Sequence, residues 1–153
     1  MIDQQAIVAH QYKGNSRMPY FLAKTEPTTY SIDDLERDHR TAWDGVANAQ
    51  AVRAIRAMRP GDHVFIYHSG GVSSIVGIAT VRSEPRDDPK NPKSAIVDLE
   101  YKGRIEPPVS LGDIKKTHQF DDWALIRQGR LSTMAAPENF VAWMRERYPK
   151  AKI

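Results

Sequence analysis

The sequence of 153 residues contains no cysteine. This absence excludes disulfide bonds, thiolate zinc ligands and cysteine nucleophiles. No apolar run is long enough to cross a bilayer, and the first residues lack the apolar centre of a signal peptide. We therefore expect a cytoplasmic protein that does not interact with membranes.

Two common catalytic signatures are missing as well. The five histidines show no ligand spacing, and neither an HExxH nor a GxSxG motif occurs. A metal centre and a serine hydrolase site are therefore not expected. The sequence predicts no cofactor.

The charge balance is only mildly basic. Lysine and arginine number 22 against 19 acidic residues, which gives a net charge of +3. This excess permits contact with phosphates, but it does not suit a protein that coats nucleic acid without specificity. Apolar residues make up 41% of the chain, which is enough for one core. We expect one domain that acts as a monomer.

The first seventeen residues differ from the rest. They are polar and show no sustained period, and Met18 then precedes Pro19 and an apolar strand. The sequence predicts that residues 1–17 are a disordered extension, or that the natural domain begins at Met18. The folded domain is expected to span residues 18–153.

Periodicity and capping signals predict the elements of the domain. Ser31 with Asp34 resembles a capping box, with Tyr30 and Leu35 in the positions of a hydrophobic staple across it, and Asn48 is a candidate cap for a second helix. The expected helices are Ser31–Asp38, Ala49–Met58, Leu111–Thr117 and a last one that begins near Pro137. The expected strands are Tyr20–Lys24, His63–His68, Ile75–Val81 and Ala95–Tyr101, and residues 82–94 are expected to form an exposed loop.

Short links join the middle strands, so these strands are expected to pair antiparallel. Gly77 and Ala79 share one face of their strand, which suits a tightly curved sheet or the close approach of another group. No repeated βαβ unit occurs. The sequence therefore predicts an α+β fold with a small, curved or barrel-like sheet.

Several segments resemble the EVE domain family in the family's order. They are YFLAKTEP, YSIDDL, TAWDGVANAQA, PGDHVFIYHSG, IVGIA and ALIRQGRLS. The resemblance implies a PUA-like, small antiparallel β-barrel flanked by helices. The same group includes domains that hold a modified base against tryptophan walls. The resemblance thus implies that the chain binds DNA or RNA and accepts one modified base in a pocket.

By similarity, the pocket combines three segments of the chain. Its floor would be Lys24, Thr25 and Glu26, its aromatic wall Trp43, and its rim the end of a strand. The full set of residues predicted for the pocket is Lys24, Thr25, Glu26, Trp43, Asp44, Val46, Asn48, Tyr67, His68 and Ser69.

Each of these residues also has a structural interpretation. Trp43 stands outside any apolar stripe, yet it could belong to the core. Asn48 suits a helix cap, and His68 suits a structural histidine. Glu26 or Asp44 could accept a hydrogen bond from the exocyclic amine of cytosine or adenine, but Lys24 and Glu26 could equally form a surface ion pair. Trp123 and Trp143 are expected in the core.

Three arginines are candidate phosphate ligands. Arg127 and Arg130 flank a glycine in a short turn, and Arg53 lies beside the apolar face of its helix. Two other functions remain open. Related ASCH-type domains act as nucleoside amidohydrolases through lysine, threonine and glutamate, but the neighbours Lys24 and Thr25 should point to opposite faces of a strand. A protein-interaction module with a vestigial pocket is the other alternative.

Overall fold

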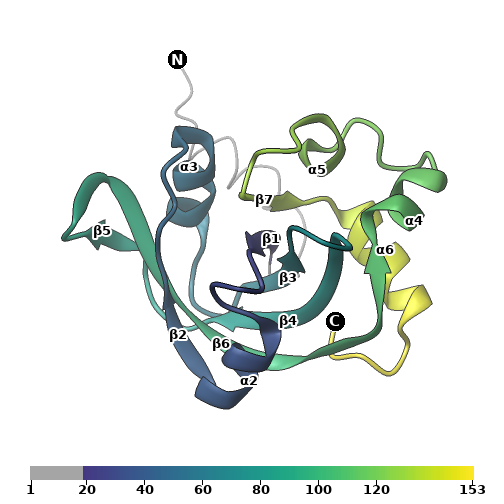
Figure 1. The fold of residues 1–153 in the computed structure, drawn as a ribbon, viewed down its shortest axis with the longest axis horizontal. Coiled ribbons are helices and arrows are strands. Elements are labelled where there is room, and N and C mark those ends of the chain that lie inside the picture. Colours follow the sequence, from purple (N-terminus) through teal and green to yellow (C-terminus); the bar gives the residue numbers. More distant parts are fainter. Residues whose placement is uncertain (1–18) are drawn as a thin grey trace.

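The computed structural model describes residues 19–153, so the predicted extension 1–17 lies outside the described part. Five helices and a seven-stranded sheet make up this part (Figure 1). The strands are β1 (Tyr20–Thr25), β2 (Arg40–Trp43), β3 (His63–His68), β4 (Ser74–Val81), β5 (Arg86–Asp88), β6 (Asn91–Ser110) and β7 (Thr133–Ala136). The helices are α2 (Ile32–Asp38), α3 (Ala49–Ala57), α4 (Leu111–Lys116), α5 (Ala124–Arg127) and α6 (Glu138–Arg147).

The strand order is β2-β6-β4-β3-β1-β7, and β5 pairs with β6. The predicted α+β class is confirmed, and so is the antiparallel pairing of β3 with β4 and of β4 with β6. The sheet as a whole is mixed, because β1 runs parallel to β3. Within residues 19–153 the edge strands β2 and β7 do not pair with each other, so the curved sheet stays open instead of closing into a barrel.

Both predicted helix caps are present. The Ser31 side chain accepts a hydrogen bond from the Asp34 amide, and the Asp34 carboxylate accepts one from the Ser31 amide. Asn48 Oδ1 accepts from the amides of Gln50 and Ala51, at 2.8 and 3.2 Å. These bonds satisfy amide groups that have no partner inside a helix, and they fix where α2 and α3 begin.

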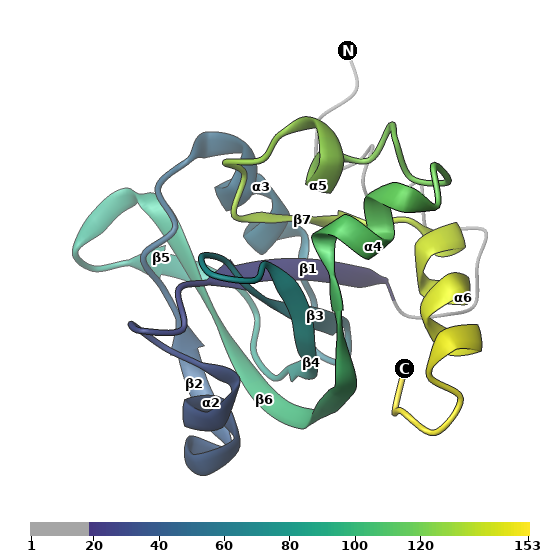
Figure 2. The same ribbon diagram turned by 45° about the vertical axis from the view of Figure 1, so that its right-hand side comes forward.

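The sheet bends around α2. Gly77 faces Ile32 so closely that a Cβ atom at this position would lie 2.3 Å from Ile32 Cδ1. The register between β4 and β6 shifts near Gly77 and again before Ala79. Figure 2 shows the long strand β6 sweeping past β4 toward α4. The prediction that small residues on this face permit close approach is therefore confirmed.

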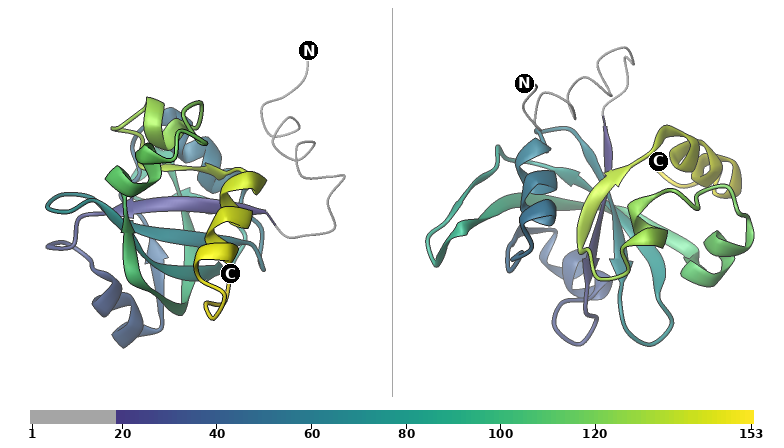
Figure 3. Two further views of the ribbon diagram at one scale, coloured as in Figure 1. Left: turned by 90° about the vertical axis from the view of Figure 1, so that its right-hand side faces the viewer. Right: turned by 90° about the horizontal axis from the view of Figure 1, so that it is seen from above.

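An aromatic cluster joins α6 to the sheet. The Phe140 ring packs against Phe65 of β3 at 5.6 Å and against Trp123 at 4.5 Å between ring centres. Trp123 is buried in the core, as predicted, whereas Trp143 is only partly buried and packs against the core from outside. Figures 1 and 3 show α6 and α3 on different sides of the sheet, with β1 running through its middle.

Three local predictions need correction. Residues 82–94, expected to form a loop, contain β5 and the start of β6. These two strands form an exposed hairpin, so their polar residues resemble those of a loop. The strand expected at Ala95–Tyr101 is the centre of the longer β6. Trp43, expected in a turn, is the last residue of β2 and pairs with Val97.

Candidate nucleic-acid interface

The parallel pairing of β1 with β3 brings two predicted segments together. Lys24 lies opposite Tyr67 and Thr25 opposite His68 in the register. The Ser69 amide continues the pairing and donates to the Thr25 carbonyl at 3.0 Å. The carboxyl ends of both strands therefore meet at one edge of the sheet, which is where open sheets of parallel strands commonly bind ligands.

Lys24 is half-buried between β3 and the turn of residues 127–130. Its Nζ donates to the Gly129 carbonyl at 3.0 Å and lies 5.3 Å from the centre of the Tyr67 ring. Its amide also donates to the Ser132 carbonyl at 2.8 Å. Burial lowers the pKa of Lys24. The predicted floor of the pocket thus touches the predicted phosphate-binding turn.

Thr25 and Glu26 point to different neighbours. The Thr25 hydroxyl donates to the Tyr30 carbonyl at 2.8 Å, on the side opposite to the Lys24 contact. The exposed Glu26 carboxylate accepts from Ser69 Oγ at 3.3 Å and lies over Gly70. Gly70 has a φ of +87°, which favours glycine, and a Cβ atom there would lie 2.9 Å from Glu26 Oε2 and would displace the carboxylate.

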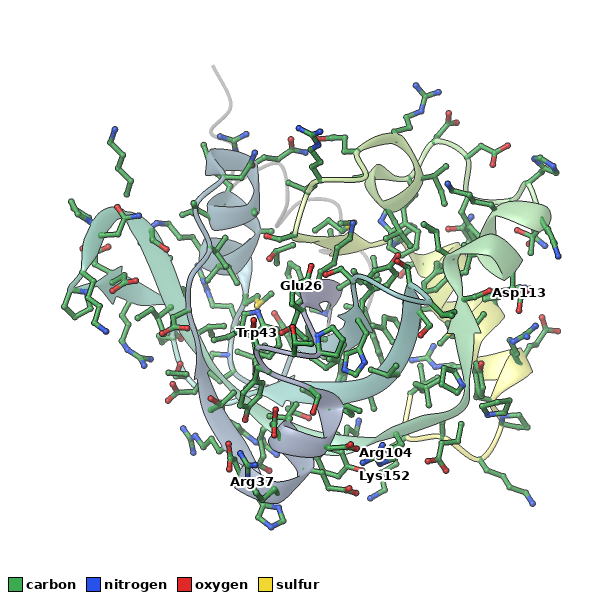
Figure 4. The ribbon with its side chains drawn as sticks, in the orientation of Figure 1. Glu26, Arg37, Trp43, Arg104, Asp113 and Lys152 are labelled. Atoms are coloured by element: carbon green, nitrogen blue, oxygen red, sulfur yellow. The ribbon has the colours of Figure 1, made fainter. Side chains whose placement is uncertain are left out.

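Trp43 belongs to this site through Tyr30, a residue that sequence reasoning placed only beside a helix cap. The two rings meet edge-on at 6.3 Å. The Tyr30 amide donates to the Glu26 carbonyl at 2.9 Å, so the turn after β1 joins Trp43 to the strand end. Figure 4 shows Glu26 and Trp43 near the centre of the same view. Trp43 is only 7% exposed.

The residues after Trp43 are arranged unevenly. Asp44 is exposed, whereas the Val46 side chain is buried and its carbonyl accepts from the buried Ser94 hydroxyl. Gly45 between them is exposed and has a φ of +77°. Asn48 is exposed, but its side-chain oxygen is used by the cap of α3. Val46 thus anchors a short loop whose tip, Asp44–Gly45, faces solvent.

His68 has the structural contact that its alternative interpretation predicted. Its Nε2 accepts from the Ile32 amide at 3.0 Å, so the ring proton lies on Nδ1. Burial lowers the pKa of His68, which favours this neutral form. The contact attaches the first turn of α2 to the end of β3.

The three candidate phosphate ligands lie around the same side of the domain. Arg127 and Arg130 are exposed in the turn that Lys24 contacts, and Arg127 forms an ion pair with the exposed Asp122 at 3.0 Å. Arg53 is exposed on α3. It lines a cavity of about 280 Å³ between α3 and β7, together with apolar residues that include Leu131.

Residues 19–153 contain no group of three or more histidine, aspartate or glutamate side chains placed to hold a metal ion. None of the helices in this part is long and apolar enough to cross a membrane.

Known proteins share this architecture. The chain is 31% identical to thymocyte nuclear protein 1 of Rattus norvegicus, over 69% of the chain and 59% of the relative, so it spans about three fifths of the length of that relative. A protein of Rhodopseudomonas palustris solved by NMR has a TM-score of 0.78 at 32% identity, covering 84% of this chain and 92% of the other.

A crystal structure of human THYN1 in complex with DNA that contains 5-methylcytosine has a TM-score of 0.74 at 26% identity, covering 84% of this chain and 98% of that one. The family profile described as the EVE domain matches residues 19–147. The resemblance seen in the sequence is confirmed, and the chain belongs to the EVE domain family.

Proposed function

We propose that this protein binds nucleic acid and accepts one modified base at the joined carboxyl ends of β1 and β3, beside Trp43. The observation that carries the proposal is the convergence of an exposed carboxylate, a half-buried lysine and an aromatic pair at one sheet edge. The DNA complex of human THYN1, a member of the same family, supports a nucleic-acid partner.

Glu26 is the proposed reader of the base edge. Its carboxylate is exposed and oriented by the Ser69 hydroxyl. A carboxylate accepts a hydrogen bond from the exocyclic amine of cytosine or adenine, which thymine lacks. The neighbouring Lys24 adds positive charge beneath the base, and its contacts with Gly129 and Tyr67 hold it there.

Trp43 is the proposed stacking wall, and because its ring is buried, stacking of a base requires a movement of the protein. Because the ring is only 7% exposed, a base reaches its face only after a local movement, which we assign to the neighbouring Asp44–Gly45 tip. This tip is exposed, and no atom would meet a Cβ at Gly45 within 4 Å, so the surroundings leave room for movement. Stacking on an aromatic side chain contributes about 1–3 kcal/mol per base, which offsets part of the cost of unstacking the base from its neighbours.

The phosphates on either side of the base are assigned to Arg53, Arg127 and Arg130. Arg127 exchanges its exposed partner Asp122 for a phosphate at little cost, because exposed ion pairs contribute only about 0–1 kcal/mol. Such contacts strengthen binding to any sequence without reading bases. The protein is proposed to act as a monomer.

Binding without turnover fits the site better than the amidohydrolase alternative. Lys24 and Thr25 are directed to different neighbours, and the Thr25 hydroxyl already donates to the Tyr30 carbonyl. Joint action of the two side chains on one substrate atom has no support in this geometry. Release of product from an acylated cytidine, lost in Lys24→Ala, would contradict this interpretation.

Fluorescence anisotropy tests the proposal with single-stranded and duplex oligonucleotides that differ only in one cytosine or 5-methylcytosine. The protein should bind the modified strand more tightly, and Glu26→Gln should weaken binding to both strands, because cytosine and 5-methylcytosine carry the same exocyclic amine. Thr28→Ala, on the exposed turn after β1, provides a control. Equal affinity for all strands at several salt concentrations would refute base recognition while leaving phosphate binding intact. Analytical ultracentrifugation of the complex measures its mass, which should correspond to one protein chain per oligonucleotide if the protein acts as a monomer.

A further inference from the structure

A second group of polar side chains lies at the opposite ends of the same two strands. Tyr20 and His63 are the first residues of β1 and β3, and they face each other in the register. Lys102 reaches this pair from β6, and Arg145 reaches it from α6. Because β1 rises about 3.3 Å per residue, this group lies roughly 17 Å from the proposed base site.

The four side chains form one connected array. Lys102 Nζ donates to His63 Nδ1 at 3.4 Å. The His63 and Tyr20 rings lie 4.8 Å apart. Arg145 Nη2 donates to the Tyr20 hydroxyl at 3.2 Å, and its guanidinium lies 5.5 Å from the centre of that ring. Four elements that are distant in the sequence thus hold two cations and two polar rings in fixed positions.

Positive charge prevails around this array. Lys152 in the C-terminal segment and Arg82 after β4 add to the positive field at Lys102 (Figure 4 labels Lys152). Among residues 19–153, no aspartate or glutamate side chain lies within ion-pair distance of Lys102, Arg145 or Lys152. Arg82, by contrast, has an exposed partner in Glu100.

The titration of the array agrees with its geometry. Burial, and then the neighbouring cations, lower the pKa of Lys102 and bring that of His63 to about 4. No carboxylate contributes to either shift. Half-buried cations that repel one another are costly to hold together, and a bound anion removes this cost.

We propose that Lys102, Arg145, His63 and Lys152 form a binding site for a phosphate group, separate from the base site. Arginine and lysine together supply the charge and the several N–H donors that a phosphate dianion accepts. The Tyr20 hydroxyl and the Ile153 main-chain oxygen already orient Arg145, at 3.2 Å from Nη2 and 3.3 Å from Nε, and Lys152 is exposed beside Ile153. The ligand is a phosphate ester, either on a small molecule or in a nucleic-acid backbone.

Titration of inorganic phosphate into ¹⁵N-labelled protein tests the site, with chloride holding the ionic strength constant. Saturable shifts are expected at the amides of Lys102 and His63. The His63 ring should titrate at a higher pH when phosphate is bound, because the anion favours its protonated form. Shifts that grow linearly without saturation, or a His63 titration that phosphate does not move, would overturn the proposal.

Charge-removing variants locate the site. Lys102→Met should weaken phosphate binding about tenfold, the effect of losing one charge-assisted hydrogen bond. Arg145→Lys keeps the charge but loses the planar donor set, and it should also weaken binding. Lys90→Met removes the same charge from the exposed turn after β5 and should change nothing. If Lys102→Met and Lys90→Met lose phosphate affinity equally, binding depends on general surface charge and the proposed site is refuted.

Binding measurements with two further ligands, a nucleoside monophosphate and an unmodified oligonucleotide, distinguish a small phosphate ester from a nucleic-acid backbone. Both are measured in an Arg127→Ala background, which removes one of the three proposed phosphate contacts at the base site. A Lys102→Met effect on the monophosphate alone identifies a small ester as the ligand. An effect on the oligonucleotide identifies the backbone. No effect on either ligand overturns the proposal, whatever the outcome at the base site.

Discussion

Replacing Trp43 with alanine should affect both the stability of the domain and its binding to a modified base. The ring is 7% exposed and touches Tyr30 edge-on, so its removal leaves a cavity beside β2. Substitutions of this kind cost about 3–5 kcal/mol of unfolding free energy, against roughly 5–15 kcal/mol for a whole domain. We therefore expect Trp43→Ala to fold with a clearly lower melting temperature.

The binding loss is separate from the loss of stability. If a base stacks on the ring, Trp43→Ala should weaken binding to the modified strand by about 1–3 kcal/mol, which is roughly 5- to 150-fold. Fluorescence anisotropy, recorded well below the melting temperature of the variant, measures this loss. Circular dichroism at the same temperature gives the folded fraction, which corrects the apparent affinity.

Two variants separate stacking from destabilisation. Trp43→Phe keeps an aromatic face and should recover most of the affinity. Trp143→Ala removes a tryptophan from α6, where it packs against Phe120 and Phe140. It should lower stability without changing the affinity of the folded protein. The stacking hypothesis fails if folded Trp43→Ala binds the modified strand as tightly as the parent does.

Three other predictions follow from single contacts. Arg127→Ala should weaken binding to modified and unmodified strands alike and reduce the slope of log K against log salt by about 0.9, since one phosphate contact is lost. Fluorescence anisotropy at several salt concentrations measures this slope, and a change in base preference would contradict the prediction. His63 should destabilise the domain in acid. Its folded pKa of about 4 lies below the unfolded value, so stability falls by about 2 kcal/mol as pH drops from about 7.5 to about 5. Burial raises the pKa of Asp62 to about 6, so protonation of this carboxyl stabilises the folded state by about 1 kcal/mol over the same pH range and opposes the effect of His63. Urea unfolding should therefore show that the free energy of unfolding falls more steeply in acid for Asp62→Asn, and that it rises in acid for His63→Phe. Gly77→Ala should lower the free energy of unfolding by about 1–3 kcal/mol, because the new Cβ would meet Ile32. Thermal unfolding of the double variant with Ile32→Ala should show a smaller loss of stability than the sum of the two single variants. Strict additivity of the two losses would argue against the clash.

Local signals explain what the sequence predicted well. The caps at Ser31 and Asn48 depend on side chains that bond to amides two or three residues away, so their residue types and spacing are visible in the chain itself. The strand His63–His68 was predicted with its observed bounds because it is an apolar run that ends at turn residues on both sides.

Long-range pairing explains what the sequence did not reveal. Nothing near Tyr20–Thr25 indicates that its partners are β3 and β7, so the parallel pairing was not predicted. The polar residues of β5 lack the apolar alternation that marks a half-buried strand, since this hairpin is mostly exposed. Tyr30 joins the site only through the turn that follows β1, and its sequence position signalled no more than a helix cap.

The central position of β1 has a consequence for how the domain forms. Its neighbours lie far along the chain, because Tyr20 pairs with His63 on one side and with Ala136 on the other. Pairings of such long sequence separation slow folding, since a large loop must close before they contribute any energy. A nascent chain that ends before Gly129 would leave β1 without β7 at its open edge and the Lys24 ammonium without the Gly129 carbonyl. The site at the end of β1 is therefore completed only after almost the whole domain has been synthesised.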